Sequence, residues 1–197
     1  MAKDYETALQ LFVPLAEQGN AAAQNELGAM YEHGWGLPED AKKAVKWYRL
    51  AAIQRYADAQ TNLGFMYYDG KGVARDYEEA AKWFRLAARR GYAKAQFLLG
   101  VMFSAGNGVS KSFTEAAKWY RLAAEQGEAK SQYMLGMMYE HGVGVEIQKD
   151  DIHAYAWFIL ALANGDEDAA ERKQNLNLPQ VSIDKAQAFS REMVQQN

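Results

Sequence analysis

The sequence predicts an all-α protein made of stacked helix hairpins, and an internal repeat is the main reason. The dipeptide Leu-Gly recurs at intervals of 36 residues, starting at Leu27, Leu63, Leu99 and Leu135. Each copy is followed by a Gly-x-Gly triplet and then by a Trp-aromatic pair, and these pairs start at Trp47, Trp83, Trp119 and Trp157. Self-similarity at a period of this length is the signature of a repeat architecture, so the 197 residues are expected to form an array of similar units.

Each unit is expected to contain two helices. In the first unit, Gln24, Leu27 and Tyr31 are spaced three or four residues apart, which places them on one side of a helix. Ala44 and Trp47 begin the same spacing in the second helix. One hairpin cannot bury these side chains by itself, so neighbouring units are expected to stack and to share a continuous core.

Glycine and aspartate mark the ends of these helices. Gly34 lies where a helix needs a left-handed residue to end, and Asp40 suits the start of the next helix. Arg55 occupies the position that is glycine in the other units, so its helix is expected to be less well capped. Gly28 and its copies should remove a side chain where the partner helix crosses, and the small residues Ala51-Ala52 should do the same from the other side.

The repeats predict one continuous domain. The sequence begins in the second half of a unit, and its last residues lose the repeat spacing and resemble a cap. The expected parts are an N-terminal half-repeat (1–19), four repeats (20–55, 56–91, 92–127 and 128–165) and C-terminal capping helices (166–197).

Composition excludes several classes of protein. The chain has no cysteine, which removes disulfide scaffolds and thiol nucleophiles. Its net charge of -3 comes from interspersed residues of both signs, which gives no basic footprint for a nucleic acid. The longest uncharged apolar stretch, 154–163, is too short to cross a bilayer and is expected to be a buried helix.

The sequence predicts no metal site, no cofactor and no enzymatic activity. His33 and His141 occupy equivalent positions in distant units, and His153 with Asp150 is explained by the start of a helix. The Gly-x-Gly triplets lack the third glycine and the Lys-Ser/Thr pair of a phosphate-binding loop. No Ser/His/Asp group lies at a nucleophile elbow.

The segment from Ala59 to Gly91 shows the full pattern, Ala-x-x-x-Leu-Gly-x-x-Tyr-x-x-Gly-x-Gly-Val-x-x-Asp-x-x-x-Ala-x-x-Trp-Phe-x-x-Ala-Ala-x-x-Gly. This pattern resembles the Sel1-like repeat, a relative of the tetratricopeptide repeat. The resemblance implies a right-handed α-solenoid whose first helices line a concave surface. It also implies an adaptor that assembles other proteins, as many bacterial members do.

The resemblance also bears on location and on enzymatic activity. Members with a similar opening often follow a secretion signal, so the chain is expected to be periplasmic or secreted if a signal was removed, and cytoplasmic otherwise. One branch of the family holds each repeat with a disulfide and has been linked to β-lactam binding or hydrolysis. The absence of those cysteines here weakens the transfer of that activity.

Comparison between the copies predicts where a partner would bind. Positions that are constant between copies are those that make the copies stack, and positions that vary can encode recognition. On a helix the two sets fall on opposite faces, so the variable positions of the first helices should line a concave groove. The expected groove residues are Asn25, Glu32, His33, Asp58, Thr61, Phe65, Tyr68, Asp69, Lys94, Phe97, Val101, Lys130, Tyr133, Met137, Glu140 and His141.

The expected function is a non-catalytic scaffold that binds a protein or peptide segment in this groove. Phe65, Phe97 and Tyr133 would bury apolar side chains of the partner, as aromatic residues do in binding hot spots. Charged residues at the two rims would orient the partner. The chain itself is expected to be a monomer or a weak homo-oligomer.

Several alternatives remain at this stage. The groove residues could instead pack against neighbouring helices or mediate self-association. The tail from Val181 to Val194 could cap the last repeat or fold back into the groove. A different function is a cell-wall-binding or hydrolytic, β-lactamase-like member that uses the carboxylates of Glu32, Asp69 and Glu140 together with Tyr68. A passive spacer or self-assembling module is a third possibility.

Overall fold

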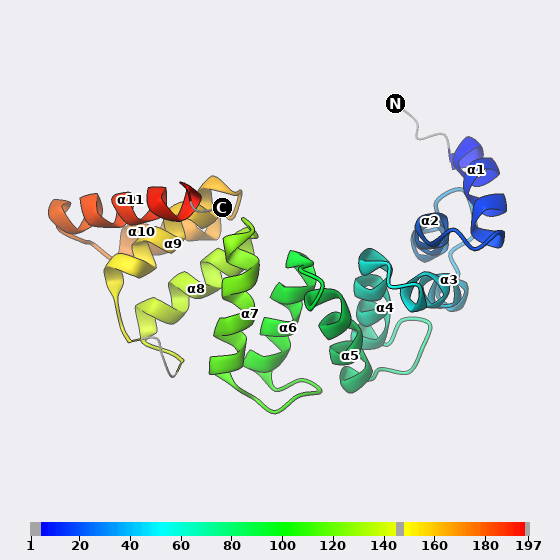
Figure 1. Cartoon of the computed structure of the whole chain (residues 1–197), viewed down its shortest axis with the longest axis horizontal. Coiled ribbons are helices and arrows are strands. Elements are labelled where there is room, and N and C mark those ends of the chain that lie inside the picture. The colour runs from blue at the N-terminus through cyan, green and yellow to red at the C-terminus, as the bar shows by residue number, and fades with distance from the viewer. Residues whose placement is uncertain (1–4, 145–147, 196–197) are drawn as a thin grey trace. The chain divides into compact units, whose positions relative to one another are not determined.

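The computed structural model describes residues 5–144 and 148–195, and this part of the chain is helical with no β-strand (Figure 1). The prediction of an all-α fold built from helix hairpins is therefore confirmed. The helices are α1 (Tyr5–Glu17), α2 (Ala21–His33), α3 (Ala41–Ile53), α4 (Ala57–Asp69), α5 (Tyr77–Ala88), α6 (Ala93–Ala105), α7 (Phe113–Glu125), α8 (Ala129–His141), α9 (Asp151–Ala163), α10 (Asp168–Asn175) and α11 (Gln180–Gln195).

The helices pack in sequence order within two compact units. The first unit comprises Met1–Arg90 with Asn107–Val109, and the second comprises Gly91–Gly106 with Ser110–Asn197. In the first unit α2 pairs with α3 and α4 pairs with α5, and α3 also packs against α4. The second unit repeats this arrangement with α6 to α9. Each hairpin thus buries its apolar residues partly against the neighbouring hairpin.

The glycines and N-cap residues end and begin the helices where the sequence predicts. Gly34, Gly70, Gly106 and Gly142 adopt left-handed φ angles of 68°, 73°, 80° and 63° at the ends of first helices. Asp40 accepts a hydrogen bond from the backbone N of Lys43 at the start of α3, as an N-cap does. Arg55 adopts a left-handed φ of 68° without the freedom of glycine, which costs about 1–2 kcal/mol.

The glycine of each Leu-Gly pair lies under an aromatic ring of the second helix. The four pairs are Gly28 with Tyr48, Gly64 with Phe84, Gly100 with Tyr120 and Gly136 with Phe158. A Cβ atom on Gly64 would lie 2.5 Å from Cε1 of Phe84. The expected close crossing is present, and at each of these glycines an aromatic ring of the second helix lies nearest. The carbonyl oxygen of Ala52 accepts from Gln60 at the contact with the next hairpin.

The glutamine that precedes each Leu-Gly pair ties neighbouring helices together. Its side-chain N donates to a carbonyl of the preceding second helix, with distances of 3.1 Å for Gln24 to Ala16, 3.1 Å for Gln60 to Ala52 and 2.9 Å for Gln132 to Ala124. Its side-chain O accepts from an amide that follows its own hairpin, from Gln54 to Gln24, Gln126 to Gln96 and Asn164 to Gln132.

One hairpin of the first unit departs from this pattern, because Arg90 stands where the other hairpins carry that amide. Oε1 of Gln60 has accordingly no hydrogen-bond partner among the residues that the structure describes. A buried polar atom without a partner is costly, so this hairpin is held less firmly than the others.

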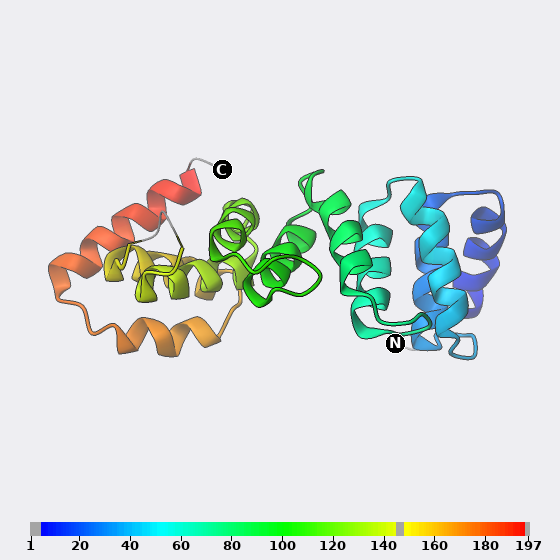
Figure 2. The ribbon, with the colours of Figure 1, turned by 90° about the horizontal axis from the view of Figure 1, so that it is seen from below.

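The C-terminal helices pack against the last hairpin, since α10 and α11 both contact α9 (Figure 2). The ring of Phe189 on α11 lies 4.5 Å from the ring of His153 on α9, and Met193 packs on the core cluster that contains Trp157. The tail thus lies on the second helix and does not fold into the predicted groove. The stretch 154–163 lies in α9 and is largely buried, as predicted. None of the described helices has the length and apolarity to cross a membrane.

Replacing Gly64 with alanine tests the ring contact. Alanine in the interior of a helix normally stabilises it by about 1 kcal/mol relative to glycine. Because the new methyl group would overlap Phe84, we expect Gly64→Ala to lower the free energy of unfolding by about 1–3 kcal/mol in urea titrations. Gly64→Ala should cost less when it is introduced into Phe84→Leu than when it is introduced into the unaltered chain. A stabilising effect of the single variant would contradict the contact.

Candidate partner-binding surface

The predicted groove residues lie on the first helices of the hairpins, at equivalent positions in each copy. We call them the first-helix surface. The first unit carries Asn25, Glu32 and His33 on α2, and Asp58, Thr61, Phe65, Tyr68 and Asp69 on α4. The second unit carries Lys94, Phe97 and Val101 on α6, and Lys130, Tyr133, Met137, Glu140 and His141 on α8.

Phe65, Phe97 and Tyr133 of this surface are half-buried, and each rests on the ring that covers the glycine of its own hairpin. The centroid distances are 5.4 Å for Phe65 to Phe84, 6.0 Å for Phe97 to Tyr120 and 5.8 Å for Tyr133 to Phe158. These separations suit favourable aromatic pairs. Each ring is therefore held from behind while part of it remains exposed, and it can contact a partner with little further loss of freedom.

Asn25 and Thr61 differ from the expectation, because both side chains are buried. They occupy the helix position that Phe97 and Tyr133 occupy in the second unit. Oγ1 of Thr61 donates to the carbonyl of Ala57 at 2.8 Å, and Oδ1 of Asn25 accepts from Asn62 at 3.0 Å. Short polar side chains at this position stay beneath their neighbours, so these two residues offer no surface to a partner.

Glu32 is held by contacts within the first unit. Its Oε2 accepts a hydrogen bond of 2.6 Å from the hydroxyl of Tyr48, the ring that covers Gly28. Nζ of Lys71, in the loop after α4, lies 3.2 Å from the carbonyl of Glu32 and 3.8 Å from its Oε1. Burial, together with the hydrogen bond and negative charge of Glu32, raises the pKa of the Tyr48 hydroxyl far above its ordinary value. Glu32 therefore joins the two helices of its hairpin.

The remaining residues of the first unit lie at the end of each first helix or near its start. The ring of Tyr68 packs edge-on against Tyr77 at 5.0 Å, and its hydroxyl accepts from Asn107 at 3.3 Å. His33 is exposed and lies 4.6 Å from the ring of Trp35. Asp69 is exposed and Asp58 is half-buried.

In the second unit the charged residues lie at the two ends of the first helices. Lys94 and Lys130 are exposed in the first turns of α6 and α8, and His141 is exposed at the end of α8. Between these ends Val101 and Met137 are half-buried and pack on core clusters. The surface of this unit therefore has an apolar middle between charged ends.

Arg172 on α10 lies beside this surface, although the repeat pattern did not predict it. Its Nη1 lies 3.8 Å from Oε1 of Glu140. A hydrogen bond to the Tyr133 hydroxyl raises the pKa of the guanidinium further, so it stays charged. The residue was missed because α10 lies beyond the repeats, where comparison between copies gives no signal.

Glu140 occupies the position of Glu32 in the last repeat but lacks its main partner. Phe158 stands where Tyr48 stands in the first repeat, so no hydroxyl reaches the carboxylate. Oε2 of Glu140 is buried and has no hydrogen-bond partner within the described part of the chain. The acid is thus retained at a cost to stability, with the cation of Arg172 beside its other oxygen.

The histidine that the sequence placed at a helix start is found there. Nδ1 of His153 lies 2.6 Å from Oδ2 of Asp150, which caps α9 through the backbone N of Ile152 and of His153. In residues 5–144 and 148–195 no group of three or more histidine and carboxylate side chains is placed to hold a metal ion.

Comparison with known proteins identifies the repeat. A family model for the Sel1 repeat matches residues 1–20, 21–56, 57–92, 93–128 and 129–166. The chain belongs to the Sel1 repeat family. Sel1 repeat proteins are generally protein-interaction scaffolds that bind protein partners, and their fold is typically non-catalytic.

Several solved structures share this fold. A protective antigen of uropathogenic Escherichia coli with an SLR fold is 38% identical, with a TM-score of 0.84 over 88% of this chain and 37% of the antigen. The chain thus spans little more than a third of that protein. A Sel1 repeat protein from Oxalobacter formigenes is 34% identical, with a TM-score of 0.76 over 91% of this chain and 75% of that one. An immunity protein of Pseudomonas aeruginosa shares the fold at 20% identity and a TM-score of 0.59, over 100% of this chain and 75% of that one.

Exchanging the rings of the first and last repeats tests the roles of Glu32 and Glu140. Phe158→Tyr should give Glu140 the hydroxyl that Tyr48 gives to Glu32. We expect this variant to raise the free energy of unfolding by about 1–2 kcal/mol, and Tyr48→Phe to lower it by a similar amount. Urea titrations at neutral pH measure both. If Phe84→Tyr, in a hairpin where Tyr68 occupies the position of Glu140, has the same effect as Phe158→Tyr, the role of the carboxylate is contradicted.

The raised pKa of Tyr48 predicts how stability depends on alkaline pH. Burial also raises the pKa of Tyr120, so both hydroxyls keep their protons when unfolded tyrosines, with a pKa of 10.0, lose theirs. The stabilising contribution is therefore complete below that pH and is lost above it, by up to about 1.4 kcal/mol per pH unit per group. In urea titrations between about pH 8 and 11 we expect a shallower decline for Tyr48→Phe/Tyr120→Phe than for the unaltered chain. Parallel curves would disprove this.

Proposed function

We propose that this Sel1 repeat chain is a non-catalytic scaffold that binds a protein or peptide segment on its first-helix surface. The observation that carries the proposal is the set of half-exposed rings supported from behind, namely Phe65 in the first unit and Phe97 and Tyr133 in the second. Rings of this kind are typical anchors of binding hot spots.

Burial of apolar side chains of the partner supplies the affinity. Each square ångström of apolar surface removed from water contributes about 25 cal/mol, before the cost of ordering the partner is subtracted. Phe97 and Tyr133 already rest on Tyr120 and Phe158, so the scaffold loses little conformational freedom on binding. An extended segment or a helix of the partner fits this mode, because both can place apolar side chains at regular spacing.

The charged ends of the surface set the orientation of the partner. In the second unit Lys94 and Lys130 lie at the start of the first helices, whereas Glu140 lies near their end, beside Arg172. A partner segment with an acidic group near the two lysines would be favoured over the reversed orientation. Exposed charges mainly affect association rate and selectivity, so the rings remain the main source of affinity.

A pull-down from cell lysate with variants of the rings tests this function. We expect the tagged chain to enrich specific proteins, and Phe97→Ala/Tyr133→Ala to reduce that enrichment at least about tenfold. Leu122→Ala is the matched control, because Leu122 is an exposed apolar residue of the same unit but lies on a second helix. Circular dichroism confirms that each variant is folded.

Two results would contradict the proposal. In the first, the ring variant retains the partners of the unaltered chain. In the second, the unaltered chain hydrolyses peptidoglycan fragments or a chromogenic β-lactam, and Glu32→Gln/Glu140→Gln abolishes the turnover.

A further inference from the structure

The second helices carry a repeated Trp-x-x-Leu pair whose exposure differs between the copies. The pairs are Trp47/Leu50, Trp83/Leu86, Trp119/Leu122 and Trp157/Leu160. In the last repeat Trp157 and Leu160 are only 6% and 7% exposed, whereas Leu86 and Leu122 are 46% and 45% exposed. The last pair is buried because α11 packs against α9. The structure therefore contains one example of a helix docked on a second helix.

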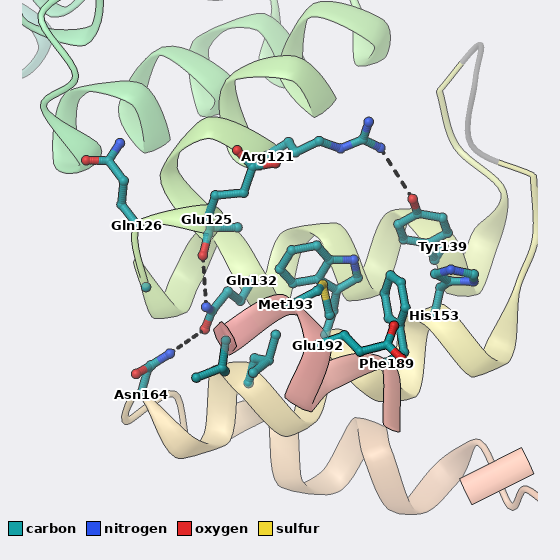
Figure 3. Close-up of a pocket in the computed structure, with 15 residues that line it drawn as sticks. Arg121, Glu125, Gln126, Gln132, Tyr139, His153, Asn164, Phe189, Glu192 and Met193 are labelled. Atoms are coloured by element: carbon teal, nitrogen blue, oxygen red, sulfur yellow. Dashed lines mark hydrogen bonds between the residues drawn. The ribbon is translucent and has the colours of Figure 1, made fainter. Parts of the chain in front are cut away.

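The side chains by which α11 packs on α9 indicate what kind of helix can bind to a second helix of the repeat. The residues that α11 turns toward the hairpin are Ala186, Phe189, Ser190 and Met193, at the spacing of one helical stripe. Beside α11 lies a cavity of about 810 Å³ lined by residues of α7, α8, α9 and α11, with Phe189 and Met193 among them (Figure 3). On its α7 side Arg121 donates to the hydroxyl of Tyr139 at 3.3 Å. An amphipathic helix with an aromatic residue and a methionine thus fits beside Trp157.

The first unit repeats these elements on α3, α4 and α5. Arg49 donates to the hydroxyl of Tyr67 at 2.6 Å, which matches the contact between Arg121 and Tyr139. Trp83 packs on the core cluster of α3 and α4, as Trp157 packs on that of α7 and α8. Leu86 and Ile53 occupy the positions of Leu160 and Glu125, which line the cavity of the second unit, and Ile53 is 65% exposed. We call Arg49, Ile53, Trp83 and Leu86 the α3–α5 face.

Substitutions at and beside the α3–α5 face distinguish it from its counterpart in the second unit. Four of them replace neutral or acidic residues by apolar or basic ones: Ile53 for Glu125, Arg55 for Gly127, Arg89 for Ala163 and Arg90 for Asn164. The three arginines are exposed. Glu79, in place of His153, is paired with Lys82 at 2.6 Å. One end of the face is therefore both more apolar and more positively charged than the surface that α11 covers.

We propose that the α3–α5 face binds an acidic amphipathic α-helix of a partner protein, in the way that α11 lies on α9. Apolar side chains at one helical stripe of the partner cover Leu86, Ile53 and Trp83. Carboxylates at the border of that stripe face Arg55, Arg89 and Arg90. This face lies on second helices, so its occupancy does not depend on the function proposed for the first-helix surface.

The charge pattern favours such a partner over α11 of a second copy of this chain. α11 carries two exposed basic residues, Lys185 and Arg191, and two exposed acidic ones, Asp184 and Glu192, so its charges offer no net attraction to the three arginines. A peptide of residues 180–195 with Lys185→Glu and Arg191→Glu keeps the docking stripe and reverses the two basic charges. It is therefore a suitable probe, and the unaltered peptide is its matched comparison.

Fluorescence anisotropy of the labelled probe, titrated with the full chain, tests the proposal. We expect the probe to bind at least about tenfold more tightly than the unaltered peptide, and its affinity to fall with added salt. Leu86→Glu should weaken binding at least about tenfold, while Leu122→Glu should not, although Leu122 has the same repeat position and the same exposure. Arg89→Glu/Arg90→Glu, at two exposed positions, should weaken binding and reduce its salt dependence.

Three outcomes would overturn the proposal. The probe fails to bind at all, or Leu86→Glu and Leu122→Glu weaken it equally. Alternatively, the unaltered peptide binds as tightly as the probe and the arginine variant leaves both unchanged, which would assign the face to exchange of α11 between copies of the chain.

Discussion

The contact between a glycine of the first helix and an aromatic ring of the second determines how each hairpin is built. At Gly64 the ring of Phe84 occupies the space that a side chain would fill, so the two helices approach closely. This contact fixes which face of the first helix is turned inward. The adjoining face, where Phe65 lies beside the same ring, is then left partly exposed. The candidate binding residues thus depend on a packing contact that lies directly behind them.

The constant residues of the repeat allowed much of the fold to be predicted. Leu-Gly, Gly-x-Gly and the Asp caps act through local backbone geometry and close packing, which every copy needs in the same form. The ring that lies on the glycine was not predicted, because spacing alone shows that two helices cross but not which side chain lies at the crossing. The role of the glutamine was also missed, since its two hydrogen bonds join residues far apart in the sequence.

The candidate surface could be predicted by position but not by side-chain exposure. Asn25 and Thr61 share a helix position with Phe97, yet their short side chains remain in the interior. Glu32 and Glu140 share another position, but only Glu32 faces a tyrosine hydroxyl. Arg172 lies outside the repeat and could be found only in three dimensions. Side-chain length and the identity of the opposite residue, which comparison of one position at a time ignores, account for these differences.

The glutamine contacts also bear on how strain passes along each unit. The side chain of Gln132 on α8 donates to the carbonyl of Ala124 on α7 and accepts from Asn164 at the end of α9. Three helices are thus joined through a single side chain. Such a clamp makes neighbouring hairpins loosen together, in keeping with the nearest-neighbour coupling of repeat arrays. At Gln60 half of the clamp is missing, because Arg90 offers no amide to its oxygen. Within the first unit, the hairpin that contains Gln60 is therefore expected to unfold first under force or on heating.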